Sequence, residues 1–161
     1  MAKITSLINN CLTIASEYPH LSGLSIEPGA EFTWDSANVK IIYDPNDPNL
    51  PVQLLHELGH AVLKHSAYKQ DIVLLKLERD AWEKAQSLGK AVAIDITDEV
   101  IKNSLDTYRD WLHDRSLCPN CSATGVQISE HYECIACGQA WRPNEARSCA
   151  LRRYKTKIHP V

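Results

Sequence analysis

The sequence predicts an α+β fold in three parts: a main domain over residues 1–115, a small cysteine-rich module over residues 116–141 and a basic tail over residues 142–161. Three observations support this prediction. Segments with apolar residues at helical spacing flank a region of short β-type segments. One of the helical segments contains two histidines four residues apart, and two C-x-x-C pairs follow it near the C-terminus.

The composition fits a globular intracellular protein. Hydrophobic residues make up 44% of the 161 residues, which is enough for a core, and the net charge of −3 indicates no particular partner. No stretch approaches the apolar length of a membrane span, and the first residues lack a signal-peptide core. We therefore expect a cytoplasmic protein without a membrane partner. In a reducing compartment the two cysteines outside the C-x-x-C pairs, Cys11 and Cys149, should be free thiols, with Cys11 buried.

The first third of the chain predicts one helix and a small sheet. Apolar residues repeat at helical spacing over residues 3–18, and Pro19 ends this helix. Residues 21–26, 31–34 and 39–43 read as three short strands separated by turn signals, which we interpret as a meander. A loop with three prolines follows over residues 44–51 and leads into the next helix, with Asn49 as its N-cap.

That next helix, expected to run to about Ser66, carries the sequence His-Glu-Leu-Gly-His in an apolar run. On a helix His56 and His60 share one face and can bind a single zinc ion. Glu57 can then take a proton from a water on that ion, because the metal lowers the pKa of this water to about 7. Gly59 weakens a helix, and its presence makes sense if another backbone or a substrate comes close there. The pattern is typical of metalloproteases.

The following helix, predicted over residues 71–88, offers a third ligand. Its inward face should hold Leu74, Leu75, Glu78, Ala81, Trp82, Ala85 and Leu88. A lone carboxylate on an apolar stripe must be protonated, paired or bound to metal. Since a protein zinc site needs a third ligand, Glu78 is the candidate. The alternative is a buried salt bridge to Arg or Lys, and Glu83 and Asp71 are weaker substitutes as ligands.

A last helix is predicted over residues 97–113, with Thr97 as N-cap and His113 on the surface. A second metal site should follow it. The four cysteines of the two C-x-x-C pairs are Cys118, Cys121, Cys134 and Cys137, and the residues between the pairs read as a hairpin. This layout is typical of a zinc ribbon, whose four thiolates leave no open position, so its zinc is structural. A redox role for one pair is the alternative.

Residues 142–161 hold six basic residues and one acidic residue, a net charge of +5 in a chain that is acidic elsewhere. Such asymmetry can mark a nucleic-acid partner, and Trp141 nearby offers one stacking surface. A solvated tail explains the same residues slightly better.

Residues 56–60 and Glu78 together make the chain resemble the zincin metallopeptidases with a glutamate ligand, and more narrowly the intracellular ImmA/IrrE peptidase family. The resemblance covers residues 35–90, where Glu78 to Ala81 matches an E-x-x-A pattern. It implies that His56, His60 and Glu78 bind zinc and that Glu57 is the general base. A phage or mobile-element setting is consistent with it.

The chain departs from this family by lacking a helix-turn-helix module and by its ribbon, which is instead similar to the SprT-like proteases that act on DNA-bound proteins. There the third ligand is usually a later histidine, and His65 is poorly placed for that because it follows His60 closely on the same helix.

The expected function is zinc-dependent hydrolysis of a protein or peptide, with the substrate lying antiparallel to an edge strand at 39–43. The competing function is a zincin-like binding protein that uses its ribbon and tail to hold nucleic acid or a protein partner. The sequence does not single out an oxyanion-stabilising residue, for which Tyr43, Tyr68, His65 and His113 are candidates.

Overall fold

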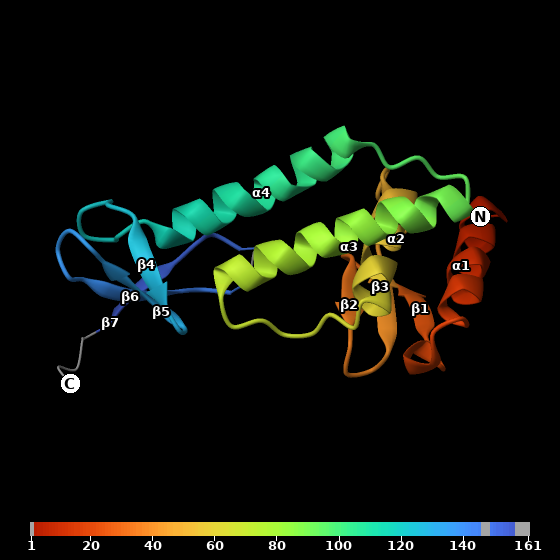
Figure 1. Cartoon of the computed structure of the whole chain (residues 1–161), viewed down its shortest axis with the longest axis horizontal. Coiled ribbons are helices and arrows are strands. Elements are labelled where there is room, and N and C mark those ends of the chain that lie inside the picture. The colour runs from red at the N-terminus through yellow and green to blue at the C-terminus, as the bar shows by residue number, and fades with distance from the viewer. Residues whose placement is uncertain (1, 146–148, 157–161) are drawn as a thin grey trace. The chain divides into compact units, whose positions relative to one another are not determined.

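The computed structural model describes residues 2–145 and 149–156, and it confirms the α+β class (Figure 1). The described residues form four α-helices and two small sheets. They divide into two compact units. The N-terminal unit comprises residues up to 67 together with 76–102, and the C-terminal unit comprises residues 68–75 and those from 103 onward. The long helices α3 and α4 each contribute residues to both units. In the described chain no helix is both long and apolar enough to cross a bilayer.

Helix α1 spans Ala2–Ala15 and ends three residues before the predicted position. Tyr18 precedes a proline and is extended, with φ −114° and ψ 108°, because the proline ring disfavours the helical region for the residue before it. A short 3-10 helix, η1 (Pro19–Leu21), follows. The predicted burial of Cys11 is confirmed, since its side chain is fully buried in α1.

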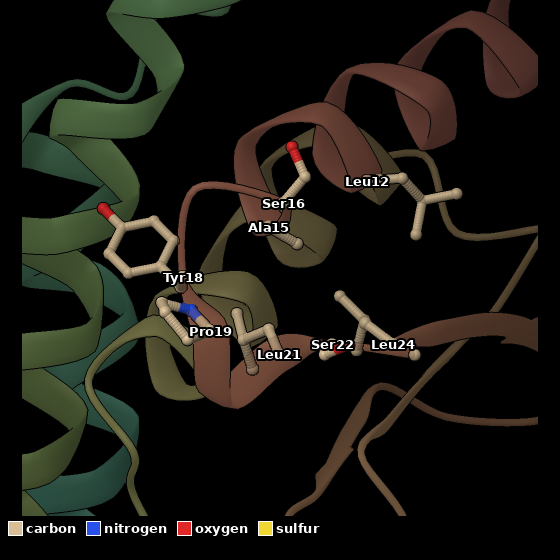
Figure 2. A pocket seen from close by; sticks show the side chains of 9 residues that line it. Leu12, Ala15, Ser16, Tyr18, Pro19, Leu21, Ser22 and Leu24 are labelled. Atoms are coloured by element: carbon tan, nitrogen blue, oxygen red, sulfur yellow. The ribbon is translucent and has the colours of Figure 1, made fainter.

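A pocket lies beside the end of α1 and the turn that follows it (Figure 2). Its lining consists of Leu12, Ala15, Ser16, Tyr18, Pro19, Leu21, Ser22, Gly23 and Leu24. The lining contains no acidic, histidine or cysteine side chain, so it does not coincide with the metal chemistry that the sequence predicts.

The first sheet contains β1 (Ser25–Pro28), β2 (Thr33–Asp35) and β3 (Lys40–Tyr43) in the order β1-β3-β2. The predicted meander is wrong, because β1 and β3 pair in parallel and β2 pairs antiparallel with β3. The prediction that residues 39–43 form an edge strand is wrong for the same reason. The apolar segment around Ile41, which is fully buried, takes the central position, where both of its backbone edges are paired.

Helix α2 (Leu50–Val62) carries the His-Glu-Leu-Gly-His sequence. Asn49 is its N-cap as predicted, although its side chain makes no capping hydrogen bond. The helix stops short of the predicted end at Ser66, because Leu63 is the C-cap and Lys64 adopts a left-handed conformation with φ 59°. His65 therefore lies beyond the helix, not on it as the sequence suggested.

Helices α3 (Asp71–Ala91) and α4 (Asp98–Ser116) match the two later predicted helices. The N-cap prediction at Thr97 is confirmed, because its hydroxyl accepts a hydrogen bond from the Val100 N–H at 3.3 Å. The inward face predicted for α3 is buried at Leu74, Glu78, Ala81, Trp82, Ala85 and Leu88.

The second sheet contains β4 (Gly125–Ile128), β5 (His131–Cys134), β6 (Ala140–Pro143) and β7 (Arg153–Thr156), all antiparallel and in that order. The hairpin predicted between the C-x-x-C pairs is β4–β5. Much of the segment expected to be a tail is folded: β6 extends into it, and β7 pairs with β6. Arg147 and residues 157–161 of that segment lie outside the described residues.

The C-terminal unit has a small core of its own. Cys118, Tyr132, Cys134 and Trp141 pack together with Ala123 beside them. A buried ion pair adds to it, with the Arg115 guanidinium 3.0 Å and 3.1 Å from the two carboxylate oxygens of Asp71. The hydroxyl of Tyr132 also donates to Asp71.

Candidate metal centres

The N-terminal unit brings together the three side chains predicted to bind one metal. His56 and His60 lie one turn apart on α2, and Glu78 reaches them from α3. The Nε2 atoms of the two histidines are 3.1 Å apart. The Glu78 carboxylate lies 3.1 Å from His56 Nε2 and 3.5 Å from His60 Nε2. These residues, named here the histidine–glutamate group, could hold a metal ion.

The spacing of the three donor atoms fits a small tetrahedral ion. Ligand bonds of about 2.0–2.1 Å in a tetrahedron place neighbouring donor atoms roughly 3.3 Å apart, close to the distances within this group. Both Glu78 and His56 are buried, and His60 is nearly so, with a side chain 12% exposed. Three protein donors leave one position of the tetrahedron available, which is the arrangement of catalytic rather than structural sites.

Glycine at position 59 allows α2 and α3 to approach closely enough for Glu78 to reach His56 and His60. A Cβ atom on Gly59 would lie 2.5 Å from the carbonyl oxygen of Ala81 on α3. The expectation that another backbone comes close at Gly59 is thereby confirmed. Ala81 lies three residues after Glu78, so the close approach of the helices occurs beside the ligand itself.

Glu57, the predicted general base, is buried next to the group. Burial raises the pKa of its carboxyl group, against the attraction of His56 and His60. The backbone N–H of Trp34 in β2 faces this carboxylate and, as the smallest of the causes, slightly offsets the rise in its pKa. A pKa raised above the ordinary carboxyl range moves the group towards the range useful for proton transfer near neutral pH.

Glu78 has the opposite electrostatic setting. Burial alone would raise its pKa, but hydrogen bonds and charges from His56 and His60 outweigh burial and hold the pKa below the ordinary value. Burial alone would lower the pKa of His60, and its hydrogen bond to Glu78 raises it instead. The lowered pKa favours the anionic form of Glu78, which is the form that binds a cation. The raised pKa of Glu57 favours its protonated form.

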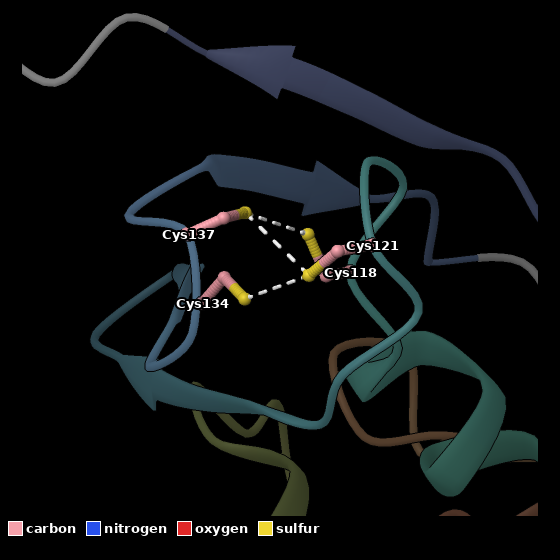
Figure 3. Close-up of side chains that lie close together, drawn as sticks. All are labelled: Cys118, Cys121, Cys134 and Cys137. Atoms are coloured by element: carbon pink, nitrogen blue, oxygen red, sulfur yellow. Dashed lines mark hydrogen bonds between the residues drawn. The ribbon is translucent and has the colours of Figure 1, made fainter.

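The C-terminal unit brings the four predicted cysteines together (Figure 3). Their sulfur atoms lie 3.7 Å apart for Cys118 and Cys137, 3.5 Å for Cys121 and Cys134, and 3.6 Å for Cys121 and Cys137. Disulfide sulfurs are about 2.05 Å apart, whereas four sulfurs at about 2.3 Å from one ion are roughly 3.8 Å apart. The spacing fits a tetrahedral metal site, named here the cysteine group.

Backbone amides support the thiolate form in this group. The N–H of Asn120 donates to Cys118 Sγ at 3.4 Å, and the N–H of Ala136 donates to Cys134 Sγ at 3.4 Å. Backbone hydrogen bonding, chiefly from Gln139, lowers the pKa of Cys137 to about 6. Four donors close the coordination shell, so a metal here would be structural.

The weaker candidate ligands lie elsewhere. Asp71 pairs with Arg115, and Glu83 is exposed and lies 3.7 Å from Arg79. Of the oxyanion candidates, Tyr68 and His113 belong to the C-terminal unit, and His113 is exposed as predicted. Tyr43 is buried at the end of β3.

Three residues make contacts at the histidine–glutamate group or at Glu57 that the sequence analysis did not predict. His65 contacts His60, Trp82 stacks on His56, and the backbone N–H of Trp34 faces Glu57. No local pattern reveals the contacts of His65 and Trp34, since both depend on segments meeting in the fold. Trp82 could have been found, because it lies one helical turn after Glu78 on the same face.

In comparisons with models of protein families, with curated proteins and with solved structures, no match to this chain was found.

Proposed function

We propose that the protein is a zinc-dependent peptidase of zincin type. The observation that supports this most directly is the convergence of His56, His60 and Glu78, three possible metal donors, next to a buried Glu57. A zinc ion held there would act as a Lewis acid towards a peptide carbonyl and would lower the pKa of a water ligand to about 7. The three residues would hold the ion, and the cysteine group would bind a second, structural zinc.

Glu57 moves the proton in this proposal. Its carboxylate takes the proton of the attacking water and then gives it to the nitrogen of the leaving amine, so that the peptide C–N bond breaks and the proton balance is kept. The Trp34 N–H faces this carboxylate and would help to orient it. Burial raises the pKa of the carboxyl group and so favours its protonated form. The positive charge of a bound cation would favour the ionised form, which accepts the proton.

The sheet order indicates which strand a peptide substrate could pair with. The sequence suggested the strand at 39–43, but that strand is central, and β2 takes its place in the proposal. β2 lies at the edge of its sheet, and the N–H of Trp34 in this strand reaches Glu57. An extended peptide that adds to the open edge of β2 would therefore run beside the histidine–glutamate group. Main-chain hydrogen bonds would hold it without a demand for particular side chains.

The test compares the wild type with E57Q, using unfolded casein carrying a fluorescent label as substrate and zinc content as a second readout. We expect E57Q to lose at least about 10²-fold in cleavage rate, the scale of general-base catalysis, while keeping its zinc. The matched control is E83Q, an exposed glutamate on α3 whose loss should change neither readout. Equal cleavage by E57Q and the wild type, or no cleavage by the zinc-loaded wild type, would refute the proposal.

A second candidate function is nucleic-acid binding by the C-terminal unit, alone or as recruitment of a peptidase to DNA-bound proteins as in the SprT-like proteases. Strand β7 supports it, because the exposed Tyr154 lies between the basic residues Arg153 and Lys155. An exposed aromatic ring with flanking cations suits stacking on single-stranded bases. Of the two flanking cations, Arg153 also donates to the Leu117 carbonyl, so Lys155 is the one to substitute. Arg142 pairs with Glu130 at 2.9 Å.

Deletion of residues 142–161 is a poor test of this second candidate, because it removes β7 and half of β6 from the sheet. Point substitutions on β7 are sharper. If the candidate is right, Y154A and K155A should each weaken binding to a labelled single-stranded oligonucleotide, and K155A should also reduce the salt dependence. Unchanged binding in both variants, or no binding by the wild type, would exclude it.

A further inference from the structure

The two histidines of the histidine–glutamate group have different surroundings on the side away from the metal position. A histidine that binds a metal through Nε2 carries its proton on Nδ1. This N–H usually donates to a carboxylate, a carbonyl or a water, which fixes the orientation and tautomer of the ring. The partner of each Nδ1 atom is therefore part of the site. The Nδ1 atoms of His60 and His56 differ in their partners.

His60 has another imidazole as its partner. Its Nδ1 atom lies 2.9 Å from Nδ1 of His65, and the two ring centroids are 5.0 Å apart at 70°. His65 is fixed in turn, because the indole N–H of Trp34 donates to its carbonyl oxygen at 3.0 Å. The left-handed turn at Lys64 lets the chain fold back after α2, so that His65 faces the helix it has just left.

His56 has no such partner. Its Nδ1 atom is buried and lacks a hydrogen bond to any of the residues that the structure describes. Its ring lies instead against the indole of Trp82, with centroids 4.1 Å apart and planes at 25°. Trp82 is 2% exposed and packs one turn after Glu78 on α3. Stacking over this area restricts rotation of the His56 ring even without a hydrogen bond.

We propose that His65 and Trp82 are positioning residues for the metal ligands: His65 fixes His60 through a hydrogen bond between imidazoles, and Trp82 fixes His56 through ring stacking. The proposal rests on metal binding by the histidine–glutamate group, which belongs to the proposed function. With a metal on Nε2 of His60, its Nδ1–H donates to Nδ1 of His65, which must then carry its own proton on Nε2. His65 thus holds His60 in the tautomer that binds metal.

The proposal assigns different chemical requirements to the two positions. Position 65 needs a hydrogen-bond acceptor where Nδ1 of histidine lies, and asparagine can supply one. Position 82 needs a flat aromatic face, and phenylalanine can supply it without the indole N–H. Methionine fills a similar part of the core but has no such face. These requirements define a pair of rescue experiments.

The experiment is a zinc titration of the full-length protein against a fluorescent chelator, with the cysteine group already loaded. We expect H65A and W82M to lower zinc affinity at the histidine–glutamate group by about 10–100-fold, the range seen for outer partners of metal ligands. H65N and W82F should bind zinc nearly as tightly as the wild type. The matched control is H113A, an exposed histidine in the C-terminal unit.

A readout specific for tautomers separates positioning from general destabilisation. Nitrogen-15 NMR of the zinc-loaded wild type should show the proton of His60 on Nδ1 with slow exchange, and H65A should lose that slow exchange while remaining folded. If W82M does not fold, W82F and the two variants at position 65 decide the matter.

The outcomes are distinguishable from failure of the proposed function. If the wild type binds no zinc at the histidine–glutamate group, the proposed function and this inference both fail. If the wild type binds zinc and both H65A and H65N bind it as tightly as the wild type, the positioning role of His65 is wrong. If a folded W82F loses as much zinc affinity as W82M, the positioning role of Trp82 is wrong. In both cases metal binding by the histidine–glutamate group is still supported.

Discussion

The carbonyl oxygen of Ala81 on α3 lies 2.5 Å from the point that a Cβ atom on Gly59 of α2 would occupy. The two helices can meet at this distance only because residue 59 has no side chain. Glu78 lies three residues before Ala81, and its carboxylate completes the group begun by His56 and His60. The glycine in His-Glu-Leu-Gly-His thus allows the Glu78 carboxylate to join the two histidines in the histidine–glutamate group.

The first prediction concerns this approach. G59A should push α3 away from α2, and overpacking of this kind costs about 1–3 kcal/mol. Because the displaced segment carries Glu78, the variant should also lose zinc affinity at the histidine–glutamate group, as measured by chelator competition. The control is G89A, whose Cβ would meet the Ile94 carbonyl oxygen at the same 2.5 Å but eleven residues from Glu78 along α3. It should be destabilised with unchanged zinc affinity. Equal loss of affinity in both variants would show that the site responds to stability alone.

The second prediction concerns the buried ion pair of the C-terminal unit. The Asp71 carboxylate is 8% exposed and the Arg115 side chain 2% exposed, so D71N leaves a buried guanidinium without its buried charged partner and with the exposed Glu145 carboxylate 3.5 Å away. Removing one member of such a pair costs about 3–5 kcal/mol, which urea unfolding can measure. The exposed pair of Arg109 and Asp106 is the matched control, and D106N should cost less than about 1 kcal/mol. Similar costs for the two variants would mean that burial does not set the strength of the Asp71 pair.

The third prediction concerns Cys11 at alkaline pH. Burial raises the pKa of its thiol from 9.0 to about 12. Above pH 9 the unfolded chain releases this proton while the folded chain keeps it, so folding stability is full below pH 9 and falls as the pH rises towards 12. The slope for one such group is at most about 1.4 kcal/mol per pH unit. Unfolding between pH 8 and 11 should therefore show a steeper loss in the wild type than in C11A. Parallel curves would place Cys11 in a solvated environment.

Local sequence pattern predicted the helices and the residues of the histidine–glutamate and cysteine groups. The cues, which are helical spacing and C-x-x-C spacing, involve residues close together in the chain. Two histidines four residues apart share a helix face wherever the helix lies, and Glu78 stood out as the one carboxylate on an apolar stripe. The cysteine pairs are recognisable by spacing alone, since each C-x-x-C forms a turn that aims two sulfurs at one point.

Pairings between distant segments could not be predicted in the same way. The parallel pairing of β1 with β3 depends on how the chain crosses between them, and the residues of the two strands do not encode that path. The same holds for β7, whose charged sequence reads as a solvated tail until it pairs with β6. His65 was predicted to lie on α2 because the apolar pattern continues to Leu63. The left-handed turn at Lys64 could not be predicted, because it lacks the glycine or asparagine that usually marks such a turn.

The fourth prediction concerns the different strengths of the two metal groups. Four thiolates of the cysteine group should hold zinc more tightly than two imidazoles and one carboxylate with an open position. Limited treatment with a chelator should therefore remove one zinc and abolish cleavage while the C-terminal unit stays folded. Restoring zinc should restore cleavage. Loss of both metals at the same chelator concentration would contradict the distinction between a closed and an open site.

The central claim is that His56, His60 and Glu78 bind a metal ion of their own. Zinc content of the intact protein, measured by native mass spectrometry, tests it most directly. We expect two zinc ions per chain in the wild type and one in H56A/H60A, with the remaining ion lost only when cysteines of the cysteine group are also replaced. A wild type that carries a single zinc ion, unchanged in H56A/H60A, would contradict it.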